Sequence, residues 1–358
     1  MRREACSRMS RYVRVAGIVL IVAALATPMT GCVFFRYRPI PDPGPSLDLE
    51  IRTWHDLDAV RDNLRGHHRL MNDLDATTAG YEELAGPAAN QGQGWEPIGS
   101  GHLVAGLLGI RLAGEVFTGS FDGQSHEIRD LFINRGGWGG SGLFGCVGTR
   151  GIIGSLGVTN ATVTIPEVGT LGVAPIAAVG ILAGFSMGSV SHSYASGAIS
   201  GDMIVGGLVG QNAGTVSDSY STANVTGQRC IGGLVGMNGS QRFSGTVSKC
   251  FSTGNVTGYE YVGGLVGKNE GTVPGADFRG TVTNCFWDIE TSRQAASDGG
   301  TGKTTVVMMD IGTFTDTDTE GLDEPWDMVA VSPGESDEDY TWNIVDGQTY
   351  PFLSWQSV

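Results

Sequence analysis

The sequence predicts an all-β protein whose fold is a right-handed parallel β-helix, or β-solenoid, of about six coils. A short N-terminal α-helical cap and an irregular C-terminal cap are expected to close its two ends. Three observations predict this fold. Glycine supplies 57 of the 358 residues, more than twice its usual share of about 7%. A short apolar motif recurs at nearly constant spacing, and the runs between its copies show no helical 3.6-residue period.

The recurring motif is a hexapeptide of the form VGGLVG. Its four copies end at Gly184, Gly210, Gly236 and Gly267, so the steps are 26, 26 and 31 residues. The match extends past the motif, since Tyr194 and Tyr220 also lie 26 residues apart. Each unit holds three short β-prone runs separated by turn residues and is too small to bury its own apolar side chains. Neighbouring units must therefore stack about 4.8 Å apart, one coil per repeat, with equivalent residues in ladders.

The segments GGLVGQNAG and GGLVGKNEG closely resemble the GLUG motif, G-[GY]-L-[VI]-G-x-N-x-G, which occurs in tandem on bacterial and archaeal surface proteins. Flanking segments such as GWEPIG at Gly94, CFWDIETS at Cys285 and YPFLSW at Tyr350 are similar to proteins of the same group. The resemblance covers residues 51–358, apart from one insert, GHLVAGLLGIRLAGEV. It implies a surface repeat architecture and no particular activity, because the group contains adhesins, uncharacterised lipoproteins and non-catalytic parts of IgA-cleaving metallopeptidases.

Residues 1–32 have the pattern of a bacterial export signal. Several arginines precede the apolar run VAGIVLIVAALATPM, and Gly31-Cys32 resembles a lipobox, in which the cysteine is lipid-modified and becomes the new N-terminus. We expect a lipid-anchored protein of the outer membrane or cell surface. A membrane anchor retained through Phe35 and plain secretion are the alternatives. Residues 33–50 are rich in proline and predict an extended tether that holds the body off the membrane.

Residues 51–290 are predicted to contain the N-terminal cap and the solenoid, and residues 291–358 an acidic C-terminal cap. Thr53, followed three residues later by Asp56, forms a capping box that begins a short amphipathic helix. The C-terminal segment loses the repeat, and its expected packing residues are Trp326, Trp342, Tyr350, Phe352 and Trp355. Caps are needed because a solenoid otherwise exposes open strand edges at both ends.

Two segments resemble catalytic motifs without the context that those motifs need. SDGGTGKTT, from Ser297, has the Gly-Lys-Thr of a phosphate-binding loop, but no apolar strand precedes it, so we interpret it as a turn leading into the C-terminal cap. HEIRD, from His126, lacks the second histidine of HExxH, and its flanks alternate as a strand does. A formal charge of −15 argues against nucleic-acid binding. We therefore expect neither a nucleotide nor a nucleic-acid partner.

The segment from Thr304 to the last residue contains twelve acidic residues and no lysine or arginine. Four of the acids occupy positions 1, 3, 5 and 12 of a calcium loop, namely Asp316, Asp318, Glu320 and Asp327. Glutamate at position 5, aspartate at position 12, an internal proline and missing flanking helices all depart from the EF-hand pattern. A solvated acidic loop is the alternative interpretation, and no other cofactor is expected.

Cys250 and Cys285 occupy equivalent positions of adjacent repeats, where earlier repeats carry Ser193 and Ser219. We interpret them as members of a ladder of small residues. The alternative is a disulfide between stacked coils, which requires Cβ atoms closer together than the strand spacing sets.

Two inserts lengthen adjacent repeats at the same corner of the coil. GSQRF (239–243) and PGADFR (274–279) each carry one phenylalanine and one arginine. Exposed aromatic and arginine side chains are typical of binding hot spots, so we expect one ligand-binding patch formed by Arg242, Phe243, Phe278 and Arg279. The alternative is that each phenylalanine folds down over its own coil.

The sequence thus favours a non-catalytic, surface-anchored β-solenoid that binds a cell-surface glycan or protein for adhesion. A carbohydrate-active β-helix, either a polysaccharide lyase or a hydrolase, is the enzymatic alternative, since such folds often carry clustered carboxylates. Between Gly180 and Glu290, however, no two of the seven acids fall at equivalent positions of adjacent coils. A purely structural envelope component is the third interpretation.

Overall fold

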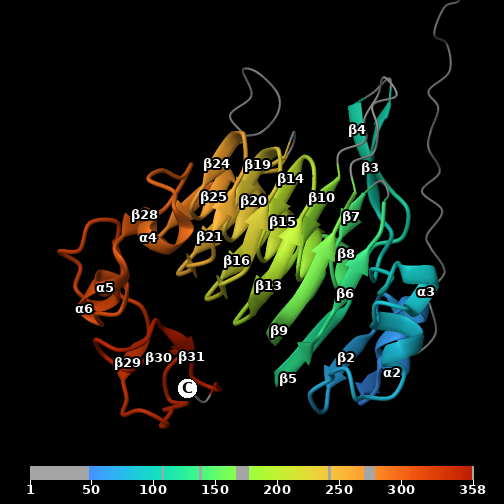
Figure 1. Ribbon diagram of the computed structural model, residues 1–358, viewed down its shortest axis with the longest axis horizontal. Helices are drawn as coiled ribbons and strands as arrows, with labels where there is room; N and C mark the ends of the chain where they lie inside the picture. Colours follow the sequence, from blue (N-terminus) through green and yellow to red (C-terminus); the bar gives the residue numbers. More distant parts are fainter. Residues whose placement is uncertain are drawn as a thin grey trace, which may run out of the picture. The chain divides into compact units, whose positions relative to one another are not determined.

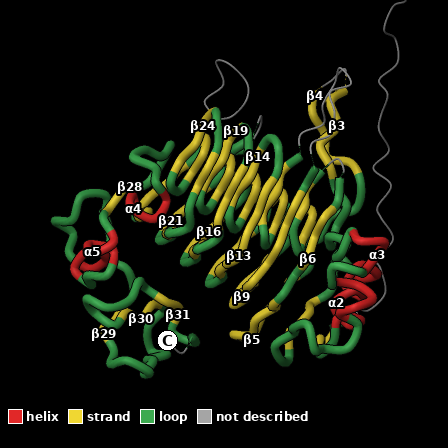
Figure 2. The backbone as a smooth tube through the Cα atoms, in the orientation of Figure 1, coloured by secondary structure: helices red, strands yellow, loops and turns green. Residues whose placement is uncertain are grey.

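The computed structural model describes residues 48–106, 109–136, 139–166, 177–240, 243–269 and 279–356, with the backbone alone for 102–106 and 109–113. It confirms an all-β parallel solenoid (Figure 1). Within these described residues, helices occur only before the first complete coil and after the last one, as Figure 2 shows. In the described part of the chain, no helix has both the length and the apolar character needed to span a membrane.

Three parallel sheets make up the solenoid. The first sheet consists of β7 (Gly140–Ser141), β10 (Ala178–Gly180), β14 (Ile204–Gly206), β19 (Arg229–Gly232) and β24 (Glu260–Gly263). The second sheet consists of β8 (Phe144–Val147), β11 (Ala183–Ser186), β15 (Val209–Asn212), β20 (Val235–Asn238) and β25 (Val266–Lys268). Each complete coil contributes one strand to each of these sheets.

The third sheet has 16 strands and is the longest. Its first row consists of β12 (Ser189–Ser191), β16 (Thr215–Ser217), β21 (Thr246–Ser248) and β26 (Thr281–Thr283). Its second row consists of β13 (Tyr194–Ser200), β17 (Tyr220–Ser221), β22 (Phe251–Ser252), β27 (Phe286–Asp288) and β28 (Thr301–Lys303), with β18 (Asn224–Thr226) and β23 (Val256–Thr257) beside it. Towards the N-terminus it includes β9 (Ile152–Thr164), β5 (Ser120–Arg129), β6 (Phe132–Asn134), β2 (His67–Leu70) and β1 (Leu49–Ile51).

The strand register confirms one coil per repeat. Val190 pairs with Val216, Val216 with Val247, and Val247 with Val282, so successive coils advance by 26, 31 and 35 residues. The inserts therefore lengthen individual coils without shifting the ladder. All of the added residues are absorbed between β20 and β21 and between β25 and β26.

Backbone contact between the first and second sheets explains the glycine content. Within one coil these strands approach so closely that a Cβ atom on Gly206 would lie 2.0 Å from the carbonyl oxygen of Val209. The same 2.0 Å clash recurs one coil later at Gly232 with Val235. Only glycine fits at such a contact, and the leucine that follows each pair of glycines fills the interior, as Leu208 does.

The predicted N-terminal helix is present as α2 (Trp54–Asp58), and Thr53 and Asp56 form its capping box. It continues as a 3₁₀ turn, η1 (Ala59–Asn63), followed after β2 by η2 (Tyr81–Ala85) and α3 (Ala89–Gly92). The Trp54 ring packs against Tyr81 and Trp95, both at 5.7 Å between centroids. This aromatic cluster closes the core at that end.

The unusual insert forms an antiparallel hairpin of β3 (His102–Gly106) and β4 (Gly109–Ala113). The hairpin interrupts a sixth coil, which stacks on β8 towards the N-terminus. Ile98, before the hairpin, bridges to Phe144, and Phe117, after the hairpin, bridges to Val147. The chain then continues into β5, which pairs with β9 of the next coil. The expected number of about six coils therefore agrees with the structure.

The C-terminal segment divides into two parts. After α4 (Ile289–Ser292), residues 294–303 lie across the last coil. The remainder, which we call the tail (residues 304–356), contains α5 (Thr305–Met308), α6 (Gly312–Thr315), β29 (Met328–Ala330), β30 (Trp342–Ile344) and β31 (Phe352–Leu353). The tail packs along the side of the solenoid, an arrangement that the sequence analysis did not predict.

Candidate ligand-binding surface

An aromatic ladder runs along the outside of the second row of the third sheet. The rings of Tyr194 and Tyr220 stack at 4.9 Å and 5°, and those of Tyr220 and Phe251 at 4.8 Å and 6°. Phe286 continues the ladder in register. Because the rings repeat at the coil spacing, the surface would form a flat aromatic track if it were open.

The tail covers this track. Trp355 lies 5.4 Å from Tyr194, Trp342 lies 5.8 Å from Phe251, and Trp326 packs on Phe286 at 6.2 Å. All four ladder residues are consequently buried. The ladder is part of a second hydrophobic core and is not an exposed binding surface.

Asp288 joins the tail to the last coil. Its carboxylate accepts hydrogen bonds from Thr305 Oγ1 at 2.7 Å and Tyr350 Oη at 2.6 Å, besides two backbone N–H groups of α4. Burial acts to raise the pKa of Asp288, but the hydrogen bonds from Thr305, Tyr350 and the two backbone N–H groups together outweigh it and lower the pKa. Burial, together with the bond to Asp288, raises the pKa of Tyr350 to about 12.

The segment that resembles a phosphate-binding loop closes the solenoid end. Ser297 Oγ accepts a hydrogen bond from Val266 N at 2.9 Å, and Asp298 Oδ2 accepts one from Asn269 N at 2.8 Å. Gly300 has a φ of 82°, which lets the chain turn back into β28 beside β27. Thr304 is the residue that would bind magnesium in a phosphate loop, and its neighbour Thr305 donates a hydrogen bond to Asp288. The segment is therefore more than a turn, because it supplies hydrogen-bond partners for the backbone of the last coil.

The HEIRD segment lies on strand β5, as its alternation predicted. His126 Nδ1 is 3.2 Å from Asp73, and Arg129 bonds both Asp73 at 2.9 Å and Glu127 at 2.6 Å. Glu127 also accepts a hydrogen bond from the hydroxyl of Tyr194, the first ring of the ladder. These groups form an ion-pair network between the N-terminal coils and the aromatic ladder.

The structure describes two of the four residues of the predicted patch. Phe243 is 48% exposed, in a turn where Ser240 N donates to Phe243 O at 2.8 Å. Arg279 has a 63% exposed side chain, with its guanidinium 3.5 Å from Asp298. Phe243 therefore does not fold down over its coil. Arg242 and Phe278, like the lipidation candidate Cys32, lie outside the described residues.

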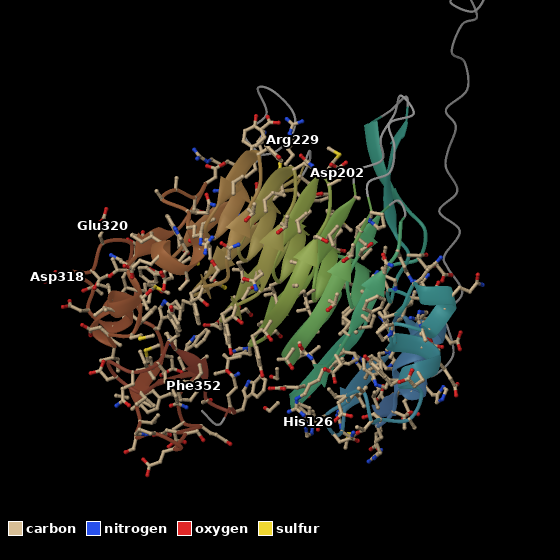
Figure 3. The ribbon with its side chains drawn as sticks, viewed as in Figure 1. His126, Asp202, Arg229, Asp318, Glu320 and Phe352 are labelled. Atoms are coloured by element: carbon tan, nitrogen blue, oxygen red, sulfur yellow. The ribbon has the colours of Figure 1, made fainter. Side chains whose placement is uncertain are left out.

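The four predicted calcium ligands are not gathered around one point. Asp316 Oδ1 accepts a hydrogen bond from Asp318 N at 3.0 Å, while Asp327 turns to Thr341. Figure 3 shows Asp318 and Glu320 at the outer edge of the molecule. Among the described residues, no three histidine, cysteine, aspartate or glutamate side chains are placed to share a metal ion. The geometry favours the solvated acidic loop over the calcium site.

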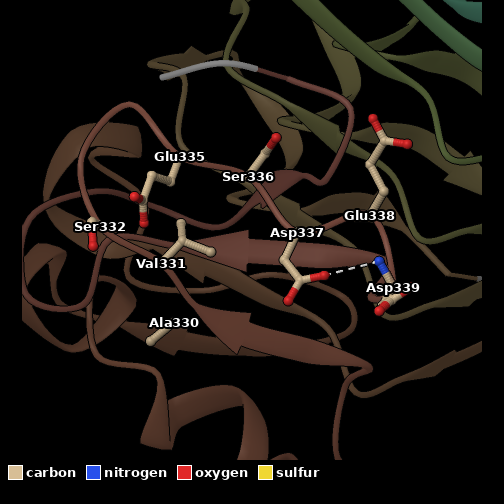
Figure 4. Close-up of a pocket in the computed structure, with 8 residues that line it drawn as sticks. All are labelled: Ala330, Val331, Ser332, Glu335, Ser336, Asp337, Glu338 and Asp339. Atoms are coloured by element: carbon tan, nitrogen blue, oxygen red, sulfur yellow. Dashed lines mark hydrogen bonds between the residues drawn. The ribbon is translucent and has the colours of Figure 1, made fainter.

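A shallow hollow in the tail is also acidic. Glu335, Asp337, Glu338 and Asp339 line it, and Asp337 Oδ1 accepts a hydrogen bond from Asp339 N at 3.0 Å (Figure 4). The tail contains no lysine or arginine to balance these charges. The hollow would therefore repel an anionic ligand.

The sequence analysis missed a group of exposed residues where the chain enters the first sheet. Tyr259 is 84% exposed and Tyr261 is 42% exposed. Lys268 Nζ lies 4.3 Å from the centroid of the Tyr261 ring, and Arg229 Cζ lies 5.4 Å from it. The signal was present in the sequence, because GYEY (258–261) stands where the two preceding coils have GDMI and GQRC. We call these four residues, with Glu260, the 259–261 corner.

Comparison with known families decides the nature of the repeats. The family profile described as the GLUG motif matches residues 201–226, 227–257 and 258–286. These residues are three GLUG repeats. The boundaries of each repeat fall immediately before a strand of the first sheet, so one GLUG repeat is one coil.

Two relatives match part of this chain. Halomucin of Haloquadratum walsbyi is 32% identical over 161 residues, which are 44% of this chain and 2% of halomucin. A protein of Evansella cellulosilytica, provisionally named Gly-rich membrane protein, is 33% identical over 144 residues, or 40% of this chain and 14% of that protein. The matched region thus spans only a small part of either relative.

A solved structure shares the fold. A Bacteroides ovatus protein provisionally named as an immunoglobulin A1 protease superimposes with a TM-score of 0.51 over 86% of this chain and 92% of that chain. The sequences are 15% identical, so the similarity concerns the fold alone.

Proposed function

We propose that this protein is a non-catalytic β-solenoid, exported and anchored at the cell surface, that binds a glycan or protein ligand for adhesion. One observation carries the proposal. Among the described residues, four large aromatic side chains are exposed, and three of them, Phe243, Tyr259 and Tyr261, belong to the last two GLUG coils. Exposed aromatic groups on a stable scaffold are typical of binding surfaces.

The scaffold suits such a role. Its GLUG coils are fixed by backbone ladders, by buried valines and by glycine contacts, so loops at the corners are held in a constant relative position. Binding groups on a rigid support lose little entropy when they engage a ligand. The acidic tail buries the aromatic ladder and leaves the corners as the exposed aromatic surface of the coils.

Surface location is supported by three observations. The first 32 residues have an export signal that ends in a lipobox-like Gly31-Cys32. The relatives carry the names halomucin and Gly-rich membrane protein. The GLUG repeats themselves resemble those of surface proteins. We propose that the lipid on Cys32 holds the solenoid at the membrane.

The acidic residues support a non-catalytic role. Asp73 and Glu127 share Arg129 as an ionic partner, and Asp288 accepts four hydrogen bonds. Carboxylates engaged in this way stabilise the fold and are poorly placed to act as a general acid or nucleophile.

The test uses the full-length chain purified in mild detergent. We expect it to bind intact cells or immobilised glycans without releasing reducing sugars during prolonged incubation. Release of reducing sugars would favour the carbohydrate-active alternative. Neither binding nor turnover, on a broad panel of cells and glycans, would favour a purely structural envelope component.

A further inference from the structure

The 259–261 corner takes its residues from two successive coils, and its loops rest on a loop of a third coil. The N–H groups of Tyr259 and Glu260 both donate to the carbonyl oxygen of Gln228, at 3.1 and 3.0 Å. One coil earlier, the N–H groups of Gln228 and Arg229 donate to the carbonyl of Asp202, at 2.9 and 3.2 Å. Figure 3 shows Arg229 and Asp202 close together at the edge of the first sheet. These bonds fix the loops, so the side chains project from a rigid base.

The charged side chains of the corner are held in place before any ligand arrives. Tyr261 lies between Lys268 and Arg229, and Arg229 also pairs with Glu260 at 3.3 Å. Tyr261 has a left-handed backbone with a φ of 55°, a conformation that is uncommon for a bulky residue. Cys230, at the equivalent position of the preceding coil, has a φ of 54°, so this conformation is a regular feature of the coil at this corner.

Tyr259 is the most exposed large hydrophobic side chain among the described residues. Its ring therefore presents apolar surface to solvent, and the next residue in the chain, Glu260, is an acceptor that pairs with a donor, Arg229. Arginine can only donate hydrogen bonds and a carboxylate can only accept them. A ligand that uses both must itself accept and donate at neighbouring atoms, as the hydroxyl groups of a sugar do.

We propose that the 259–261 corner binds a neutral, hydroxyl-rich glycan, with one sugar ring lying on Tyr259 and its hydroxyl groups bonded to Arg229 and Glu260. Lys268, held by Tyr261, borders the same site. This inference rests on the proposed binding function and names its ligand class and residues. The Arg229–Glu260 pair balances its own charge, and Lys268 lies against the Tyr261 ring, so the corner carries one net positive charge, fewer than a strongly anionic polymer would match.

The extent of the corner favours a glycan over a protein partner. Three stacked coils span about 10 Å along the solenoid, from two spacings of about 4.8 Å. A stable protein interface needs about 800 Å² on each partner. A strip about 10 Å wide is narrow for an interface of that area. A polymer chain that contacts the corner with a few sugar units needs no greater width.

The experiment uses the full-length chain and affinity electrophoresis through gels that contain a neutral β-glucan, mannan or galactan. Polygalacturonate and dextran sulfate serve as acidic comparisons. We expect at least one neutral glycan to retard the wild type, with little dependence on salt. Tyr259→Ala should weaken retardation at least tenfold, and Arg229→Gln should weaken it as well. Tyr340→Ala, which removes an exposed tyrosine of the tail, should leave it unchanged.

The proposal is overturned if no neutral glycan retards the wild type, if only acidic polymers do so and salt abolishes the effect, or if Tyr259→Ala behaves as the wild type. Melting temperatures should be equal for wild type and Tyr259→Ala, which shows that the loss is not unfolding. If Tyr259→Ala still adheres to cells while glycan binding is absent from both proteins, the adhesive function stands and only the glycan site is rejected.

Discussion

Asn212 and Asn238 hydrogen-bond to each other inside the solenoid, with Asn212 Nδ2 2.8 Å from Asn238 Oδ1. Asn238 repeats the contact with Asn269, at 3.0 Å from Nδ2 to Oδ1. Asn238 thus accepts from the asparagine of the preceding coil and donates to that of the next, and all three side chains are buried. The invariant spacing of asparagine in the GLUG motif therefore has a physical role, since the ladder satisfies polar groups that the coil corner buries.

Asn238→Ala should destabilise the protein by about 2–3 kcal/mol, because it leaves the amide groups of Asn212 and Asn269 short of a partner in a buried site. Urea denaturation measures the change. Asn224→Ala, at an exposed asparagine of the preceding coil, is the control and should shift stability by no more than about 0.5 kcal/mol. Equal losses for the two variants would show that the ladder contributes nothing specific.

Cys250 and Cys285 should tolerate serine. Both are free, and each thiol bonds the carbonyl two residues before it, at 3.1 Å to Ser248 and 3.1 Å to Thr283. Ser219 makes the equivalent bond in an earlier coil, with its Oγ 2.6 Å from the carbonyl of Ser217. Serine at either cysteine should therefore change the free energy of unfolding by less than about 1 kcal/mol.

Cys250→Val is the control for this ladder. Valine cannot donate to the Ser248 carbonyl and adds volume to a fully buried site, so a loss of about 2 kcal/mol is expected. Thermal denaturation followed by circular dichroism compares the variants. A serine variant as unstable as the valine variant would disprove the small-residue ladder.

Removal of one whole coil, Gly206–Ile231, should leave a folded but less stable protein. Val205 pairs with Ile231, so after the deletion Val205 joins Gly232 in the correct phase. The loss of stability is expected because the deletion also removes Tyr220 from the aromatic ladder that the tail covers. Trp355, which reaches Tyr194, would then be displaced by about 4.8 Å relative to the remaining coils.

The matched deletion removes half a coil, residues 206–218. It should abolish the parallel-β circular dichroism spectrum, because every ladder beyond the cut loses its register. The whole-coil deletion should retain the spectrum and melt at a lower temperature than wild type. Identical melting of both deletions would contradict the pairing of one repeat with one coil.

Cys32 should carry a lipid. The prediction rests on Gly31-Cys32, which follows the predicted export signal. Metabolic labelling with a fatty-acid probe should label the wild type and spare Cys32→Ala. Equal labelling of both proteins, or a wild type recovered unlabelled from the medium, would point to a retained apolar anchor or to secretion.

Calcium should leave the melting temperature unchanged at millimolar concentration. Asp316 already binds a backbone N–H in its own turn, and Asp327 binds Thr341, so neither carboxylate is arranged around a common centre. A calcium-dependent rise in the wild type that is absent from Asp316→Ala would restore the calcium site.

The sequence by itself determined the coil and its period. Val190, Val216 and Val247 could be aligned in advance because a stacked coil contacts only its neighbours, so the same residue types recur at the same step. The capping box of Thr53 and Asp56 was equally predictable, since its partners lie within one helical turn. The position of Phe243 in an insert between two strands also followed from the repeat.

Only the tertiary structure decided where the tail lies and which side chains it leaves exposed. Trp355 packs on Tyr194, and Ser297 bonds the last coil at Val266, yet neither pair recurs at the repeat spacing. The contact of Lys268 with Tyr261 likewise depends on the fold of a single coil. Such contacts form once in the molecule and join segments at arbitrary separation, so no periodic or local pattern in the sequence records them.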